Sequence, residues 1–268
     1  LELSCHQLEY CRYSPHISVL LNLYEDHLDH YGSYEKYVGA KKNIFLNQNK
    51  NDIIYCRDEE KDVVGNCKSR VVVVGNVGLP FAKLSDVEGI KLRGDKNYHN
   101  CCFVKKVCDN FGITDEEFVS ALKTFSPLPH RLEHFATIGG VDYYDDSIST
   151  TVESTINAIE SIDNAKAVIL GGMDRGIDYT SLVSYLCGCR LSDIILVYAS
   201  GERIYGMSDE LKKTKNIVLL KDIDAAAEWA LNNLDGGACI LSPAAASYGY
   251  FKNFEERGKA FKKAVTGV

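Results

Sequence analysis

Residues that bind metals and phosphates gather after the first apolar run of the chain. Residues 17–23 have the pattern of a buried strand, and the polar residues that follow are Glu25, Asp26, His27, Asp29 and His30. Ser33 then opens a helical pattern that carries Lys41 and Lys42. Carboxylates and imidazoles at the carboxyl end of a strand, facing lysines on a helix, suit a metal-assisted phosphate site. A solvated loop with surface histidines explains the same residues, so the cluster alone leaves both interpretations open.

Several longer segments carry a specific resemblance to a known family. In chain order they are LELSCHQLE, LNLYEDHLDHYGSYEKYVGAKKNIF, GDKNYHN, LPHRLE, DDSISTT, GGMDRG and LSPAAASYGYFKNFEERG. Together they resemble the Mur ligases of peptidoglycan synthesis, and within that family the ligases that add D-glutamate. The segments are collinear and cover almost the whole chain, so chance is a poor explanation for the match.

The resemblance implies an ATP-dependent ligase of cell-wall synthesis that joins D-glutamate to UDP-N-acetylmuramoyl-L-alanine. In the implied reaction a substrate carboxylate becomes an acyl phosphate, and the glutamate amine then displaces phosphate. Such transfer depends on charge neutralisation and in-line positioning, and two Mg²⁺ ions are expected. The expected partners are UDP-muramoyl-alanine, glutamate and ATP. The expected protein is a cytoplasmic monomer that binds neither nucleic acid nor membrane.

The resemblance implies metal chemistry for three residues near the start of the chain. Glu2 and His27 are implied as metal ligands, with His27 also catalytic, and Lys41 as a catalytic lysine that CO₂ converts to a carbamate. A carbamate is an anion, so it would hold a second Mg²⁺ that an ammonium would repel. Lys42 is the adjacent competitor, but the register of YVGAKKNIF against the family pattern favours Lys41. A solvated helix face and an ordinary loop histidine are the structural alternatives.

Further positions match residues with which the family binds its substrates. The implied contacts are Ser4, Gln7 and Asn22 for the muramoyl group, Asn97 and Asn100 for adenine, Asp146 for ribose, and Thr150, Arg175, Ser247 and Phe254 for glutamate. Arg131 is implied as a catalytic residue near the nucleotide phosphates, which suit the forked donors of a guanidinium. Arg175 is expected to pair with a carboxylate of glutamate. Hydrogen bonds at strand ends and a surface salt bridge are the structural alternatives.

Two departures from the family pattern keep other functions open. Many D-glutamate ligases have DSKAT where this chain has DSIST, so Ile148 replaces a lysine and cannot hold an anion. An L-glutamate-adding relative is therefore an alternative within the enzyme class. The 268 residues also contain no GxxxxGK[ST] phosphate loop, and the first residue is leucine. We therefore expect a carboxyl-terminal fragment that is inactive alone, with a non-catalytic nucleotide-binding remnant as the second alternative.

Composition argues against several other classes of protein. The net charge is −7, so a general nucleic-acid surface is not expected and an anionic ligand must meet local basic groups. No apolar run approaches the roughly 18 residues needed to cross a bilayer, and no signal-peptide pattern is present. The ten cysteines include no CxxC pair, which predicts free thiols in a reduced cytoplasm rather than a zinc site.

The elements that must position these residues follow an α/β pattern. Predicted strands cover residues 17–23, 52–56, 70–75, 135–138, 141–144, 167–171, 194–198, 217–220 and 238–242. Predicted helices after the lysine-bearing one cover residues 95–111, 114–125, 152–162, 179–187, 208–213, 225–234 and 253–265. The chain is expected to open in a strand-like segment, residues 58–68 to be a loop or hairpin, and the valines of 70–75 to be buried.

The stretch SPLP at residues 126–129 marks the predicted domain boundary, because proline breaks the preceding helix. By resemblance, residues 1–127 are the carboxyl-terminal part of a central ATP-binding Mur ligase domain with a mixed sheet, without its phosphate loop. Residues 128–268 are predicted to be a Rossmann-like glutamate-binding domain. Alternating strands and helices indicate a doubly wound, largely parallel sheet there, with ligands at the carboxyl ends of its strands.

Overall fold

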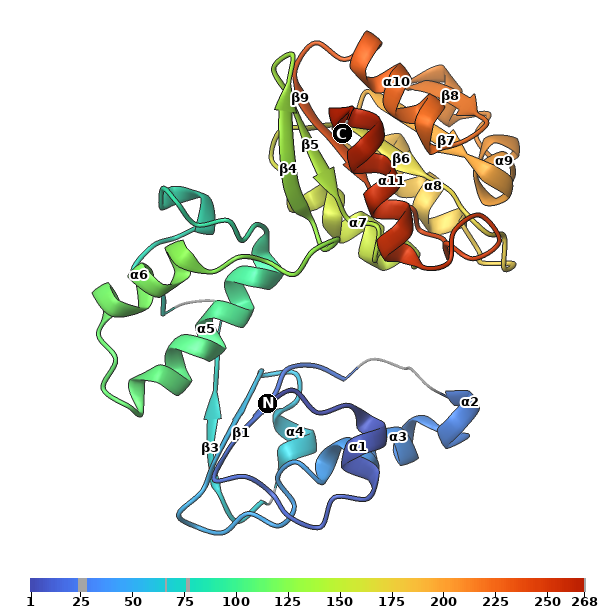
Figure 1. Cartoon of the computed structure of the whole chain (residues 1–268). Coiled ribbons are helices and arrows are strands. Elements are labelled where there is room, and N and C mark those ends of the chain that lie inside the picture. Colours follow the sequence, from blue (N-terminus) through green and yellow to red (C-terminus); the bar gives the residue numbers. More distant parts are fainter. Residues whose placement is uncertain (24–27, 66, 76–77, 268) are drawn as a thin grey trace. The chain divides into compact units, whose positions relative to one another are not determined.

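The computed structural model describes residues 1–23, 28–65, 67–75 and 78–267, and the chain forms two compact units (Figure 1). The amino-terminal unit comprises Leu1–Glu88 and Asp95–Thr124. The carboxyl-terminal unit comprises Gly89–Gly94 and Phe125–Val268. In the part of the chain that is described, no helix has the length and apolar character needed to span a bilayer.

The amino-terminal unit is built on a parallel sheet of three strands in the order β1-β2-β3. The strands are β1 Ile17–Leu20, β2 Ile53–Cys56 and β3 Arg70–Val73. The helices are α1 Cys5–Glu9, α2 Leu28–Tyr31, α3 Tyr34–Lys42, α4 Lys61–Val64, the 3₁₀ turn Leu84–Asp86, α5 Asp95–Asp109 and α6 Asp115–Thr124. Alternate residues of β2 face opposite sides: Ile54 packs with Phe45 and Val64, whereas Tyr55 packs with Cys102 and Phe103 of α5.

Three local predictions in this unit were wrong. The chain opens in the helix α1 rather than a strand-like segment, because Ser4 and Gln7 form a capping box: Ser4 Oγ accepts from the Gln7 amide at 3.3 Å, and Gln7 Oε1 accepts from the Ser4 amide at 2.8 Å. The predicted loop at 58–68 contains the short helix α4. The prediction that the valines of 70–75 are buried holds for Val74, which is 2% exposed, and is wrong for Val73 of the edge strand β3, which is 40% exposed.

The carboxyl-terminal unit contains a six-stranded sheet in the order β4-β5-β9-β6-β7-β8. Its strands are β4 Glu133–Ile138, β5 Val141–Asp145, β6 Ala165–Leu170, β7 Asp193–Val197, β8 Asn216–Leu220 and β9 Gly237–Leu241. All neighbours are parallel except the hairpin of β4 and β5, whose turn is the Gly139-Gly140 pair. The doubly wound, largely parallel sheet predicted from the sequence is therefore confirmed.

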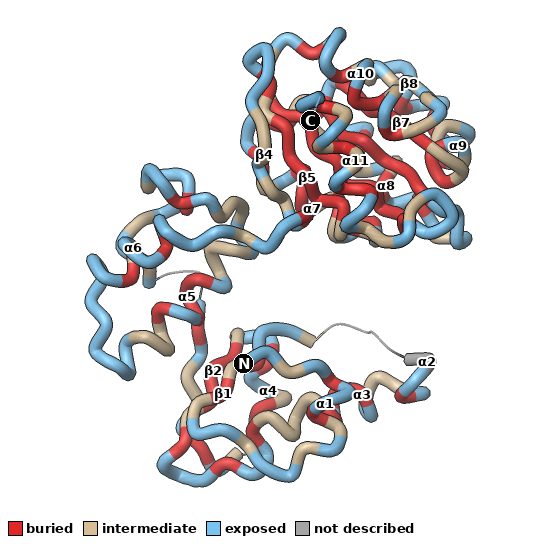
Figure 2. Tube along the Cα trace, viewed as in Figure 1, coloured by how far each residue is buried: buried red, intermediate tan, exposed pale blue. Residues whose placement is uncertain are grey.

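Helices cover both faces of this sheet, and the buried residues concentrate between the layers (Figures 1 and 2). The helices are α7 Val152–Glu160, α8 Thr180–Gly188, α9 Tyr198–Gly206, the 3₁₀ turn Leu211–Lys213, α10 Ile223–Asn233 and α11 Phe254–Thr266. Leu182 of α8 packs with Leu170 on one face, and Phe261 of α11 packs with Ile169 on the other.

The sequence missed the helix α9 and overestimated the helix predicted at 208–213, which is only the 3₁₀ turn Leu211–Lys213. α9 starts at Tyr198, which the sequence assigned to strand β7 and which has φ of 60°. A Cβ at Gly201 would lie 3.2 Å from the Leu196 carbonyl carbon, so glycine lets α9 lie close against β7. That packing is a tertiary effect, and the glycine itself weakens the local helix signal.

Candidate active site

The carboxyl ends of three neighbouring strands meet at one edge of the large sheet. β5 ends at Asp145, β6 at Leu170 and β9 at Leu241, and the three strands run parallel. The loops that follow are joined by a hydrogen bond of 2.9 Å from Gly171 N to Pro243 O. Doubly wound sheets bind ligands at such an edge, which makes it the candidate site of this unit.

Asp146 follows β5 at this edge and is only 4% exposed. Its Oδ2 accepts from Ser242 Oγ at 2.8 Å, and its Oδ1 accepts from the Leu132 amide at 3.0 Å. Burial raises the pKa of Asp146 to about 6, against the opposing effect of hydrogen bonds from Ser149, Ser242 and Leu132. Both oxygens are already hydrogen-bonded, so a ribose hydroxyl would have to use their remaining lone pairs.

Arg131 lies in a strained turn between two left-handed residues, His130 with φ of 63° and Leu132 with φ of 47°. The backbone of the turn is held firmly: His130 N donates to Glu133 Oε2 at 2.8 Å, and Ile148 N donates to His130 O at 3.2 Å. Arg131 itself is exposed, and its guanidinium has no hydrogen bond or ion pair with the described residues. The structure therefore presents Arg131 to solvent, where an anion can reach it.

Sequence reasoning missed a buried charged cluster beside this turn. His130 Nδ1 lies 2.6 Å from Asp145 Oδ2, and both side chains are buried. Lys262 Nζ of α11 lies 2.6 Å from Glu133 Oε2 and 3.4 Å from Asp145 Oδ2. His130, Glu133 and Asp145 offer metal-ligand atoms within 4.8 Å of one another, but the ammonium of Lys262 already supplies positive charge there. Only the motifs LPHRLE and DDSIST could have pointed to this cluster.

Arg175 lies in the loop after β6, is exposed, and bonds to no group in the described part of the chain. α9 holds this loop through Ser200 and Arg203. Ser200 Oγ accepts from Gly172 N at 2.8 Å while Ser200 N donates to Gly172 O at 3.1 Å. Arg203 Nη1 lies 3.1 Å from Asp174 Oδ1. Because α9 was not predicted, the sequence did not reveal these supports.

The other residues predicted to bind glutamate are less accessible. Ser247 is 3% exposed, and Thr150 and Phe254 are partly buried. Phe254 is the first residue of α11, and its carbonyl accepts from Ser147 Oγ at 2.8 Å. Arg257, a turn later on α11, is fully buried and also bonds to Ser147. The loop after β5 and the start of α11 are thus joined through Ser147.

The residues predicted for metal and muramoyl binding lie in the amino-terminal unit. Glu2 and Asn22 are exposed. Ser4 and Gln7 are bonded to each other at the start of α1. His27 lies outside the described residues. In this structure the Ser4 and Gln7 side chains begin a helix, which is the structural alternative to substrate binding for polar residues of this type.

Lys41 lies in the last turn of α3 and is partly buried. Its Nζ is 5.0 Å from the centroid of the Tyr37 ring, a cation–π distance. Cys5 of α1 and Tyr37 of α3 belong to one core cluster, so the segment that carries Glu2 leads directly into a helix packed on α3. Asn97 and Asn100 lie on α5 three residues apart, which places them on one helix face.

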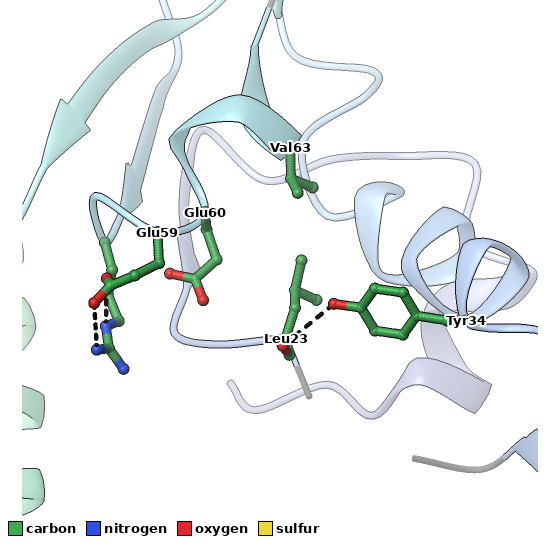
Figure 3. Close-up of a pocket in the computed structure, with 6 residues that line it drawn as sticks. Leu23, Tyr34, Glu59, Glu60 and Val63 are labelled. Atoms are coloured by element: carbon green, nitrogen blue, oxygen red, sulfur yellow. Dashed lines mark hydrogen bonds and ion pairs between the residues drawn. The ribbon is translucent and has the colours of Figure 1, made fainter. Parts of the chain in front are cut away.

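A pocket of about 230 Å³ lies at the ends of β1 and β2 in the same unit (Figure 3). It is lined by Leu23, Tyr34, Arg57, Glu59, Glu60 and Val63. Arg57 donates to Glu59 through bonds of 3.2 and 3.0 Å, and burial raises the pKa of the Glu60 carboxyl. Among the residues that the structure describes, none of those predicted for chemistry lines this pocket.

Comparison with known proteins agrees with this architecture. Residues 1–100 match the Mur ligase middle domain. The UDP-N-acetylmuramoylalanine–D-glutamate ligase of Geotalea uraniireducens is 34% identical over 289 residues, which covers 100% of this chain and 63% of the relative. The ligase of the same name from Lachnospira eligens is 31% identical over 292 residues, which covers 100% and 64%. The chain thus spans slightly less than two thirds of the length of these curated relatives.

Solved structures share the fold at low sequence identity. A MurF ligase from Thermotoga maritima in complex with ADP superposes with a TM-score of 0.64 at 18% identity, covering 94% of this chain and 62% of that one. The UDP-N-acetylmuramate-alanine ligase MurC from Thermotoga maritima gives 0.65 at 20% identity, covering 94% and 60%. The domain match, the identity along the whole chain and the fold agree, and the chain is similar to Mur ligases over its whole length, with residues 1–100 matching their middle domain.

Proposed function

We propose that the protein is an ATP-dependent ligase that adds D-glutamate to UDP-N-acetylmuramoyl-L-alanine in peptidoglycan synthesis. The observation that carries the proposal is the 34% identity to a curated D-glutamate ligase across the whole chain. The candidate site supports it, because the exposed Arg131 and Arg175 suit a site that binds phosphate and carboxylate groups. We propose a cytoplasmic monomer, with residues 1–127 as the ATP-binding part and 128–268 as the glutamate-binding domain.

For the nucleotide, we assign the contacts residue by residue. Asn97 and Asn100 meet the adenine, Arg131 the phosphates and Asp146 the ribose. The exposure of Asn100 and Arg131 is compatible with these roles. The burial of Asp146 requires the ribose to approach a carboxylate that is already bonded to Ser242 and Leu132.

The donor atoms near the start of the chain fit Mg²⁺, which prefers oxygen ligands. Glu2 offers an exposed carboxylate on the segment before α1, which packs on α3. Lys41 of α3 offers no lone pair as an ammonium, but as a carbamate it would offer two oxygens. We therefore assign Glu2, His27 and a carbamylated Lys41 as the metal ligands. The bound ions would neutralise charge on the transferred phosphoryl group.

For glutamate, we assign Arg175 to one carboxylate, and Thr150, Ser247 and the backbone at Phe254 to the rest of the amino acid. Ile148 favours one rival function, because it replaces the lysine that many D-glutamate ligases have. Ile148 is partly buried, and its amide is bonded to His130 O. Without a cation at this position, an L-glutamate-adding ligase is the second candidate.

The test is a ligation assay on the protein at its natural length, with ATP, Mg²⁺, UDP-N-acetylmuramoyl-L-alanine and each enantiomer of glutamate. We expect phosphate release and amide formation with D-glutamate and much less with L-glutamate. A preference for L-glutamate would select the second candidate. Nucleotide binding without ligation of either enantiomer would identify a non-catalytic relative.

A further inference from the structure

Asp145 and Asp146, at the end of β5, contact the residues on both sides of Arg131. Asp146 accepts from the amide of Leu132, the residue after Arg131, at 3.0 Å. Asp145 lies 2.6 Å from Nδ1 of His130, the residue before Arg131. Nδ1 donates to this carboxylate in the forms of the imidazole that carry a proton on Nδ1. The carboxylates of two consecutive residues therefore hold His130 and Leu132, the neighbours of the exposed Arg131.

The turn needs such support because its backbone is strained. His130 and Leu132 both have positive φ values, a strained conformation that a residue other than glycine keeps only when its surroundings impose it. The His130 side chain is 7% exposed and the Asp145 side chain is 0% exposed, so the contact is sheltered from water and from salt. Removal of the Asp145 charge would free the turn to relax.

Helix α11 has a glycine where the His130 and Asp145 side chains approach it. A Cβ at Gly258 would lie 2.2 Å from His130 Nδ1 and 2.5 Å from Asp145 Oδ2. Gly258 lies within the helix, so the close approach of the two side chains requires glycine there. Lys262, a turn further on, lies 3.4 Å from Asp145 Oδ2. The position of the pair is therefore determined by β5 on one side and α11 on the other.

We propose that Asp145 and His130 are positioning residues that fix the direction of the Arg131 guanidinium toward the nucleotide phosphates. This inference rests on the proposed function, in which Arg131 contacts those phosphates. A contact that only stabilised the unit would affect the unfolding free energy without affecting phosphate recognition. A positioning contact lowers affinity for the phosphate-bearing nucleotide and spares affinity for the nucleoside.

The test compares Asp145→Asn and Gly258→Ala in the protein at its natural length, with Gly206→Ala as the matched control. Gly206 ends α9, and a Cβ there would meet nothing within 4 Å. Calorimetry measures the affinities for ADP and for adenosine. We expect both test variants to weaken ADP binding about tenfold, as for loss of a charge-assisted hydrogen bond, with adenosine binding unchanged. In an Arg131→Met background, Asp145→Asn should cause no further loss of ADP affinity.

Amide hydrogen exchange of residues 130–132 provides a second measurement that needs no ligand. We expect faster exchange in Asp145→Asn and unchanged exchange in Gly206→Ala.

If Arg131→Met weakens ADP binding but Asp145→Asn and Gly258→Ala do not, the positioning role is wrong. If Arg131→Met has no effect on ADP binding, the phosphate contact in the proposed function is wrong. Exchange then decides whether Asp145 orders the turn, and unchanged exchange in Asp145→Asn would overturn that role. His130→Gln replaces Gly258→Ala should the latter fail to fold.

Discussion

Arg257 and Ser147 are joined by two hydrogen bonds: Nε donates to Ser147 Oγ at 3.0 Å, and Nη2 donates to Ser147 O at 2.8 Å. A third bond runs from Nη1 to Ala245 O at 2.9 Å. The guanidinium is fully buried, and burial lowers the pKa of Arg257 to about 10. One side chain of α11 thus ties together the loops after β5 and β9, which frame the candidate site.

Arg257→Met is expected to lower the free energy of unfolding by about 2–4 kcal/mol, because it leaves the buried carbonyls of Ser147 and Ala245 without these donors. Urea unfolding followed by circular dichroism measures the loss. The control is Lys259→Met at an exposed position of the same helix, which should change stability by no more than about 0.5 kcal/mol. Equal stabilities for the two variants would contradict the structural role of Arg257.

Asp146 should make stability depend on pH in an unusual direction for a carboxylate. In the folded protein its pKa is about 6, against the ordinary value of 3.8, so the folded state binds more protons between these values. Its contribution to stability therefore falls as pH rises through this window. The free energy of unfolding of Asp146→Asn, relative to that of the parent, should therefore increase by about 3 kcal/mol as the pH rises from about 4 to about 7.

Urea unfolding at a series of pH values measures this difference between Asp146→Asn and the parent. Asp209→Asn, at a residue whose side chain is 88% exposed, is the control and should leave the pH profile unchanged. A difference between Asp146→Asn and the parent that stays constant with pH would show that Asp146 is already ionised without penalty.

Lys41→Ala is expected to nearly abolish ligation, because the proposed carbamate is the anionic ligand of the second metal ion. Added acetate or formate should restore part of the activity by occupying the vacated anionic position. The matched control is Lys42→Ala, since Lys42 is the next residue on α3. Phosphate release measures the activity of Lys41→Ala, of Lys41→Ala with added acetate or formate, and of Lys42→Ala. No rescue by small carboxylates, together with an unmodified Lys41 in the metal-bound protein, would exclude the carbamate.

Arg175→Ala is expected to raise the apparent KM for D-glutamate sharply, since loss of a charge-assisted pair in a closed site costs about 2–5 kcal/mol. Arg203→Met keeps Arg175 but removes the 3.1 Å contact with Asp174, and should raise KM less. Ligation kinetics with D- and L-glutamate measure both effects. An unchanged KM in Arg175→Ala would place the glutamate carboxylate elsewhere, with Ile148 as the next position to vary.

The 268-residue chain assayed alone is expected to show no ligation. Its sequence contains no GxxxxGK[ST] loop to cradle the ATP phosphates, and such electrostatic contacts commonly contribute several kcal/mol to lowering the barrier. Phosphate release with ATP, Mg²⁺ and both substrates measures this. Robust turnover would show that other residues of the chain hold the phosphates.

The regular elements were largely predictable from local pattern. Short apolar runs bounded by turn residues must be buried, so the strands from β4 to β9 could be placed from the sequence. Local hydrogen bonding also defined helix starts, as for Thr114, which precedes α6, and Glu117 in the first turn of that helix. α1 was missed because its five residues are too few to show a hydrophobic period, although Ser4 and Gln7 have the spacing of a capping box. α9 was missed because Gly201, which fits against β7, weakens the local helix signal.

The sequence by itself therefore indicated the order of most strands and helices, the resemblance to Mur ligases, and the motifs that carry Arg131, Asp146 and Arg175. Only the tertiary structure decided which groups support them. Arg257 reaches Ser147 across 110 residues, and Lys262 reaches Glu133 across 129. The physical reason is that a local pattern reports only whether a residue is buried. Which partner a buried charge meets depends on which strands and helices pack side by side.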